Sequence, residues 1–90
     1  MELLLNVTYE YNSDIRILFK YHYGVITLED IRSTWEYAIS NKLIPKEVNG
    51  FILDYSKASF GIKIEDYVEI PNFYKEHLDV FANTRIAIVT

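Results

Sequence analysis

The first 23 residues constrain the fold most, because apolar and polar residues alternate there in two consecutive segments. A period of two predicts half-buried β-strands over residues 3–11 and 15–23. The polar cluster Asn12-Ser13-Asp14 between them predicts a three-residue turn, so the pair forms an antiparallel hairpin. We expect its apolar face to carry Leu3, Leu5, Val7, Tyr9, Tyr11, Ile15, Ile17, Phe19, Tyr21 and Tyr23. We expect its polar face to carry Thr8, Glu10, Arg16, Lys20 and His22.

A helix is predicted after Gly24. Thr27 is a suitable N-cap, and Asp30 three residues later completes a capping box. Apolar residues then follow helical spacing along one stripe. The members of this stripe are Leu28, Ile31, Trp35 and Ile39. We expect the helix to end within residues 41–43, because Pro45 disfavours helical backbone at the residue before it.

The second half of the chain predicts two further strands and a second helix. Residues 51–55 are mostly apolar without clean alternation, which is typical of an interior parallel strand covered on both sides. Residues 56–61 are expected to form a loop, residues 62–78 a helix and residues 85–90 a strand. Pro71 lies inside the helical segment, so either the helix kinks there or a new helix begins with Pro71 in its first turn.

These elements predict one α/β domain over residues 1–90 with the order β-β-α-β-α-β. If the strands step in one direction through right-handed crossovers, both helices cover the same face of the sheet. The final strand then has an open apolar edge, which is a site where another chain can pair. On this basis Arg85, Ile86 and Ile88 are candidate interface residues.

Composition excludes several classes of function. The chain has no cysteine, so disulfides, zinc-thiolate sites and cysteine nucleophiles are absent. Its formal charge is -4 and no two basic residues are adjacent, so we expect no nucleic-acid partner. No apolar run approaches the roughly 20 residues of a membrane span. The beginning of the chain does not have the pattern of a signal peptide. We therefore expect a cytoplasmic protein without a membrane partner, a metal or a cofactor.

Three strings resemble the SpoIIAA-like group of domains, which includes the STAS domains. They are Gly24-Val25-Ile26-Thr27-Leu28-Glu29-Asp30, Phe51-Ile52-Leu53-Asp54-Tyr55-Ser56 and Asn83-Thr84-Arg85-Ile86-Ala87-Ile88-Val89. The resemblance covers most of the 90 residues and depends mainly on hydrophobic pattern. It implies a SpoIIAA-like fold, with a further helix, strand and helix after Thr90.

The resemblance also implies a mainly non-enzymatic, regulatory role. Well-known bacterial STAS domains bind a partner kinase and are switched by phosphorylation of a serine at the start of the second helix. Here the corresponding positions read Gly61-Ile62-Lys63-Ile64-Glu65, and no serine is present. Ser56 and Ser59 lie upstream and do not match in register. The phosphorylation switch is therefore not expected in this chain.

The best candidate for a ligand site is the segment from residue 54 to residue 63. Ligands of open parallel sheets bind beyond the carboxyl ends of the strands, and free N–H groups at a helix start attract anions. The proposed site residues are Asp54, Ser56, Lys57, Ser59 and Lys63. The alternative is that Asp54 and the serines only cap the loop and the helix.

Catalytic candidates are weaker, because neither His22 nor His77 has a partner at a recognisable spacing. Asp54 with Glu65 or Asp66 is conceivable as an acid pair, although acids in a first helical turn are explained by the helix dipole. A pocket that brings His22 beside Asp54 would favour catalysis. The tyrosines at positions 9, 11, 21 and 23 are expected to form core beneath the helices, with a partner surface as the alternative.

We therefore expect a non-enzymatic interaction or regulatory domain that self-associates or binds a protein partner. The alternative function is a small-ligand or anion-binding module that uses the segment from Asp54 to Lys63.

Overall fold

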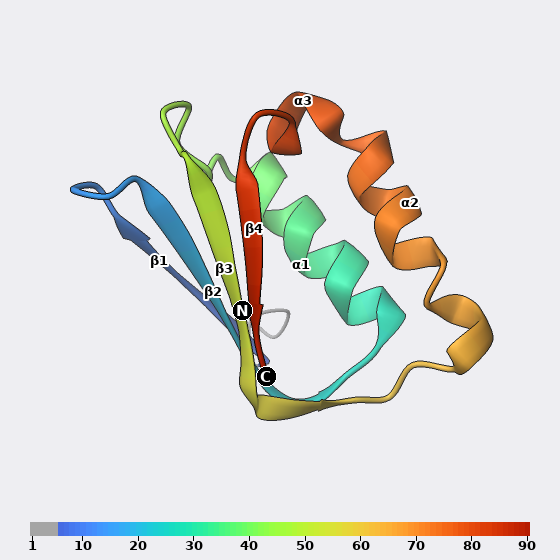
Figure 1. The fold of residues 1–90 in the computed structure, drawn as a ribbon. Coiled ribbons are helices and arrows are strands. Elements are labelled where there is room, and N and C mark those ends of the chain that lie inside the picture. Colours follow the sequence, from blue (N-terminus) through green and yellow to red (C-terminus); the bar gives the residue numbers. More distant parts are fainter. Residues whose placement is uncertain (1–5) are drawn as a thin grey trace.

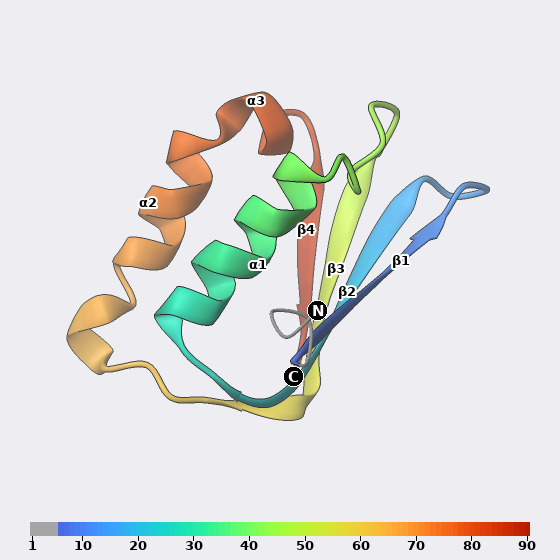
Figure 2. The same cartoon turned by 180° about the vertical axis from the view of Figure 1, so that it is seen from behind.

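The computed structural model describes residues 6–90 and is an α/β fold with one four-stranded mixed sheet. The elements along the chain are β1 (Val7–Asn12), β2 (Ile17–Ile26), α1 (Leu28–Ser40), β3 (Gly50–Phe60), the 3₁₀ turn η2 (Ile64–Asp66), α2 (Glu69–Glu76), α3 (Leu78–Phe81) and β4 (Arg85–Val89). The strand order is β1-β2-β3-β4, with β1 antiparallel to β2 and the other pairs parallel. Figures 1 and 2 show α1 and α2 side by side on one face of the sheet. No helix formed by residues 6–90 lies over the opposite face.

An antiparallel hairpin forms as predicted, but its second strand faces the other way. The part of the first predicted strand that includes Leu3 and Leu5 lies outside the described residues. Asn12 pairs with Ile17, so the connection contains four residues, Ser13 to Arg16, rather than three. The Asn12 side chain accepts hydrogen bonds from the backbone N–H groups of Asp14 and Ile15, and Arg16 adopts a φ of 57°. The register therefore differs from the predicted one by an odd number of residues, which reverses every side chain of β2 relative to β1.

The consequence is that the side of β2 predicted to be polar is the buried one. Register and pleat place Leu18, Lys20 and His22 under the helices, next to Tyr11, Tyr9 and Val7 of β1. The opposite side, here called the open face, carries the other members of each strand. Its residues are Thr8, Glu10, Asn12, Ile17, Phe19, Tyr21, Tyr23, Val25, Gly50, Ile52, Asp54, Lys57, Ser59, Arg85, Ala87 and Val89.

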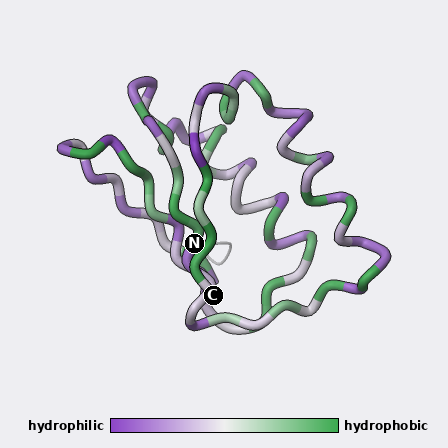
Figure 3. The backbone as a smooth tube through the Cα atoms, in the orientation of Figure 1, coloured by the Kyte–Doolittle hydropathy of each residue, from purple (hydrophilic) through white to green (hydrophobic). Residues whose placement is uncertain are grey.

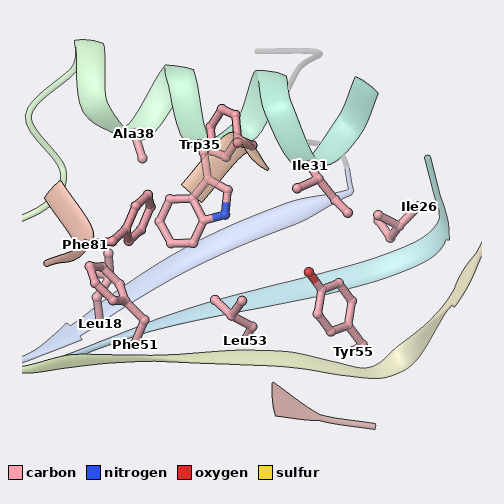
Figure 4. Close-up of a cluster of buried hydrophobic side chains, with 10 residues drawn as sticks. Leu18, Ile26, Ile31, Trp35, Ala38, Phe51, Leu53, Tyr55 and Phe81 are labelled. Atoms are coloured by element: carbon pink, nitrogen blue, oxygen red, sulfur yellow. The ribbon is translucent and has the colours of Figure 1, made fainter. Parts of the chain in front are cut away.

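Helix α1 begins and ends where the sequence predicts. The Thr27 hydroxyl accepts from the Asp30 N–H at 3.1 Å and the Asp30 carboxylate accepts from the Thr27 N–H at 2.9 Å, which completes the capping box. Asn41 is the C-cap. Figure 4 shows Ile31, Trp35 and Ala38 pointing from α1 toward the sheet. Trp35 is fully buried, and its indole N–H donates to the Tyr74 hydroxyl at 3.1 Å, which joins α1 to α2.

Three predictions for the second half of the chain are wrong. Residues 56–60 are not a loop, because β3 continues beside the second half of β2 as far as Phe60. The strand is not covered on both sides, because helices lie over one face only. The predicted helix over residues 62–78 is divided into η2, α2 and α3. Pro71 lies in the first turn of α2, which confirms the second alternative for that residue.

Candidate functional site

The candidate site is a pocket on the open face, where the four-stranded sheet narrows to the β2–β3 ribbon. Its volume is about 180 Å³. Within residues 6–90 the β3–β4 pairing ends at Asp54 and Val89, and beyond that point β3 pairs with β2 alone. The pocket is lined by Tyr21, His22, Tyr23, Asp54, Ser56 and Lys57. Three of the five residues predicted for a ligand site, Asp54, Ser56 and Lys57, therefore come together here.

A β-bulge in β3 creates the pocket. Tyr21 pairs with Asp54 and Tyr23 pairs with Lys57, so two steps along β2 correspond to three steps along β3. In a regular strand, residues 54 and 57 would point to opposite faces of the sheet. The extra residue places Asp54 and Lys57 on the same face, beside the two tyrosines. No feature of the sequence analysis pointed to this bulge, because residues 56–61 were interpreted as a loop.

The Asp54 carboxylate is held in position by Ser56. Its Oδ1 atom accepts from the Ser56 N–H at 2.8 Å and from the Ser56 hydroxyl at 2.6 Å. These two hydrogen bonds lower the pKa of Asp54 below its ordinary value, and the positive charge of Lys57 acts in the same direction. The group is therefore an anion at neutral pH. Asp54 thus accepts local hydrogen bonds from Ser56, as in the alternative interpretation of this segment, and these bonds hold its charged carboxylate in place at the pocket.

His22 reaches Asp54 only through the backbone. The His22 ring lies on the helix-covered face and its Nδ1 atom is 3.1 Å from the carbonyl oxygen of Asp54, whereas the carboxylate lies on the open face. The ring is buried and stacks on Tyr55 with 3.9 Å between centroids. Burial lowers the pKa of His22 to about 4, and the nearby Lys20 also lowers it. His22 is thus a neutral group of the interior that lines the pocket together with Asp54, and its ring contacts the backbone carbonyl of Asp54 rather than the carboxylate.

The other predicted site residues lie outside this pocket. Ser59 is in the last part of β3 and Lys63 is the N-cap of η2, and neither lines the pocket. Glu65 and Asp66 belong to η2, so they do not form an acid pair with Asp54 in this pocket. His77 is the C-cap of α2, and its ring lies 4.6 Å from that of Phe73.

The four hairpin tyrosines are divided between the two faces. Tyr9 lies under α1, where its hydroxyl donates to the main-chain carbonyl of Thr34, and Tyr11 lies within 3.3 Å of the Glu47 carboxylate. The prediction that all four share one face is wrong, because only Tyr21 and Tyr23 are on the open face. Of the candidate residues on β4, Arg85 is on the open face. Ile86 and Ile88 point to the helix side and remain 39% and 61% exposed.

Lys20 is predicted on the polar face of the hairpin, but its side chain is fully buried. Its ammonium nitrogen lies 4.3 Å from the centre of the Trp35 ring and has no hydrogen-bond partner among residues 6–90. Burial lowers the pKa of Lys20 to about 7. A four-residue turn places Lys20 on the same face of β2 as Leu18, so recognising the length of the turn would have predicted its burial.

A second hollow of about 730 Å³ lies between the α1–β3 connection and the α3–β4 turn. It is at the amino ends of the parallel strands, opposite to the end where ligands of α/β sheets usually bind. Within residues 6–90 no group of three or more histidine, aspartate or glutamate residues is arranged to hold a metal ion. None of the helices in this part of the chain has the length and apolar character needed to cross a membrane.

Comparison with known proteins identifies the fold. The structure is similar to part of a solved crystal structure of Mglu, with a TM-score of 0.56 and 12% sequence identity. The match covers 90% of this chain and 18% of the Mglu chain, so this domain corresponds to less than a fifth of that protein's length. At this level of identity the similarity shows the fold alone. No protein-family model and no curated protein matches the sequence.

Proposed function

We propose that this domain is a non-enzymatic interaction or regulatory domain that self-associates through its open face. The observation that carries the proposal is the row of aromatic residues along β2 on that face. Phe19 and Tyr21 stack with 6.0 Å between their centroids, and Tyr23 continues the row with 37% of its surface exposed. Ile17 and Ile52 lie beside them. Exposed apolar patches of this kind are typical of protein-binding surfaces.

A second copy of the same domain is the partner that fits the charges of this face. Glu10 lies on β1 at one edge of the sheet and Arg85 lies on β4 at the other edge. If two open faces pack together about a twofold axis parallel to the strands, β1 of each copy lies over β4 of the other. By register Glu10 of one copy then lies level with Ala87 of the other, two residues along β4 from Arg85, while the aromatic rows meet at the centre. Figure 3 shows that most of β4 is hydrophobic, and on the open face this strand contributes Arg85, Ala87 and Val89.

The SpoIIAA-like relationship is part of the same proposal. It is supported by the order of the elements and by helices that lie on one face of the sheet. A regulatory role in the cytoplasm is what that relationship implies.

The test is the oligomeric state of the chain and of a Phe19→Lys variant. We expect a dimer in analytical ultracentrifugation between about 1 and about 100 µM, a range typical of modest interfaces. A charge at the centre of the apolar row is expected to shift the chain to monomer while circular dichroism remains unchanged. Ile64→Lys is the matched control, because Ile64 is 86% exposed and lies outside the sheet. A monomer throughout this range, or equal effects of both variants, would contradict the proposal.

A small-ligand site is the second candidate function, and the pocket at Asp54, Ser56 and Lys57 is the observation that favours it. The sequence suggested an anion as the ligand. The carboxylate of Asp54 repels an anion at this position, whereas Lys57 attracts one, so both charges determine which ligand can bind.

A further inference from the structure

The pocket presents two opposite charges on one face of the sheet. Asp54 is beside Tyr21 and Lys57 is beside Tyr23, because each pair is in register across the β2–β3 ladder. Tyr21 and Tyr23 are two positions apart on β2, which corresponds to about 7 Å along the strand. The two side chains therefore leave the sheet on the same face, and the positive charge of Lys57 contributes to the lowered pKa of Asp54.

The bulge shows that this arrangement is built by the fold. Without the extra residue in β3, Asp54 and Lys57 would lie on opposite faces. The Asp54 carboxylate is oriented through Oδ1 by both hydrogen bonds from Ser56, which leaves Oδ2 without a hydrogen bond from residues 6–90. An oriented carboxylate with a free oxygen is suited to accept from an ammonium group of a ligand.

The two charges together select the class of ligand. An anion is attracted by Lys57 and repelled by Asp54, and a cation meets the reverse situation, so a ligand with one charge gains little. A ligand that carries both a positive and a negative group satisfies both side chains. The volume of about 180 Å³ is smaller than the pockets of about 300–1,000 Å³ that hold drug-sized molecules. The half-buried Tyr21 and the exposed Tyr23 supply apolar and aromatic contact.

We infer that this pocket binds a free α-amino acid, with the ammonium group at Asp54, the carboxylate at Lys57 and an apolar or aromatic side chain against Tyr21 and Tyr23. The inference rests on the small-ligand function proposed above and names its ligand class. It does not depend on self-association, although the same face is involved. A dimer that covers the face would compete with the amino acid for Tyr21 and Tyr23.

The experiment is a titration of the isotope-labelled chain with L-phenylalanine, followed by amide chemical shifts. We expect saturable shifts at residues 21–23 and 54–57 with a dissociation constant of about 1 mM, which is typical of a small, open site. N-acetyl-L-phenylalanine and L-phenylalaninamide each lack one charge, and we expect each to bind at least about tenfold more weakly. A parallel titration with inorganic phosphate tests the anion alternative.

Matched variants test whether Asp54 and Lys57 bind the two charged groups of the ligand. Asp54→Asn keeps an oxygen that accepts from Ser56 and removes the charge, and Lys57→Gln removes the other charge. We expect each to weaken L-phenylalanine binding at least about tenfold. Asp66→Asn and Lys63→Gln make the same changes of charge outside the pocket and are expected to bind as the parent does.

The outcomes separate the ligand class from the site. Shifts with phosphate and none with L-phenylalanine overturn the amino-acid inference and leave a small-ligand site in place. Equal binding of L-phenylalanine and its two blocked derivatives overturns the inference as well. If neither L-phenylalanine nor phosphate moves the amides of residues 54–57, both the ligand class and the small-ligand function fail.

Discussion

The imidazole of His22 and the backbone carbonyl of Asp54 form a contact of 3.1 Å that joins β2 to β3 beside the bulge. A carbonyl oxygen only accepts, so Nδ1 carries the ring proton and Nε2 is unprotonated. Nε2 is buried and has no hydrogen-bond partner among residues 6–90. The structure therefore favours the neutral ring, and protonation would place a charge between the sheet and the helices.

The stability of the chain is expected to fall as the pH decreases from about 6.5 toward 4. Burial lowers the pKa of folded His22 to about 4, below the ordinary value of 6.5, so the unfolded chain takes up the proton first. Protons bound preferentially to the unfolded state favour unfolding. Urea unfolding at successive pH values measures this dependence. His22→Phe retains an aromatic ring over Tyr55 and cannot titrate, so its slope in this range should be shallower, and identical slopes would contradict the argument.

Lys20 is expected to make the stability of the chain depend on pH in the alkaline range. Burial lowers the pKa of folded Lys20 from 10.5 to about 7, against the favourable contact of a charged amine with Trp35. Between these two values the unfolded chain holds a proton that the folded chain lacks. Stability should therefore rise with pH from about 7 to about 10.5, by about 1.4 kcal/mol per unit at most.

A Lys20→Met variant tests this prediction, because methionine keeps most of the apolar length and cannot titrate. We expect the variant to unfold at a higher temperature than the parent at pH 7 and to lose the alkaline rise in stability. Lys75→Met changes an exposed lysine of α2 and should leave the profile as it is. A less stable Lys20→Met variant at pH 7 would show that the buried amine contributes favourably.

Local chemistry explains what the sequence could predict. The capping box at Thr27 and Asp30, the end of α1 before Pro45 and the position of Pro71 in a first helical turn each depend on neighbouring residues only. These features are determined by residues a few positions apart in the sequence, so the sequence alone predicts them.

The facing of β2 and the candidate site could not be derived in that way, because both depend on register. The turn before Ile17 is one residue longer than predicted, and β2 therefore faces the other way. Lys20 and His22 were assigned to the polar face because of their polar ends, although the rest of each side chain is suited to burial. One extra residue at Tyr55 and Ser56 brought Asp54 and Lys57 together. Pairing between strands decides such shifts, and composition does not report them.

Trp35 is expected to be the most sensitive core position. Its ring meets Phe51, Tyr74 and Phe81 edge-on, with centroid distances of 5.4, 6.2 and 4.9 Å. Trp35→Ala removes these contacts and the hydrogen bond to Tyr74, at a cost of about 3–5 kcal/mol. That is a large share of the stability of a small domain. Urea unfolding followed by circular dichroism measures the loss. Glu36→Ala, on the exposed side of α1, should change stability by less than about 0.5 kcal/mol.

Gly50 and Gly61 offer a matched pair for testing how closely β4 approaches β3. A Cβ atom added at Gly50 would lie 2.8 Å from the backbone oxygen of Arg85, whereas one added at Gly61 would lie 2.8 Å from a methyl group of Val25, whose side chain is 58% exposed. A backbone oxygen in a sheet cannot move alone, but an exposed valine can rotate away. We therefore expect Gly50→Ala to lower the melting temperature by several degrees, corresponding to about 1–3 kcal/mol, and to speed amide exchange in β4. Gly61→Ala should change both measurements much less. Equal losses in the two variants, or unchanged exchange in β4 of Gly50→Ala, would show that the β3–β4 spacing is not limited by this contact.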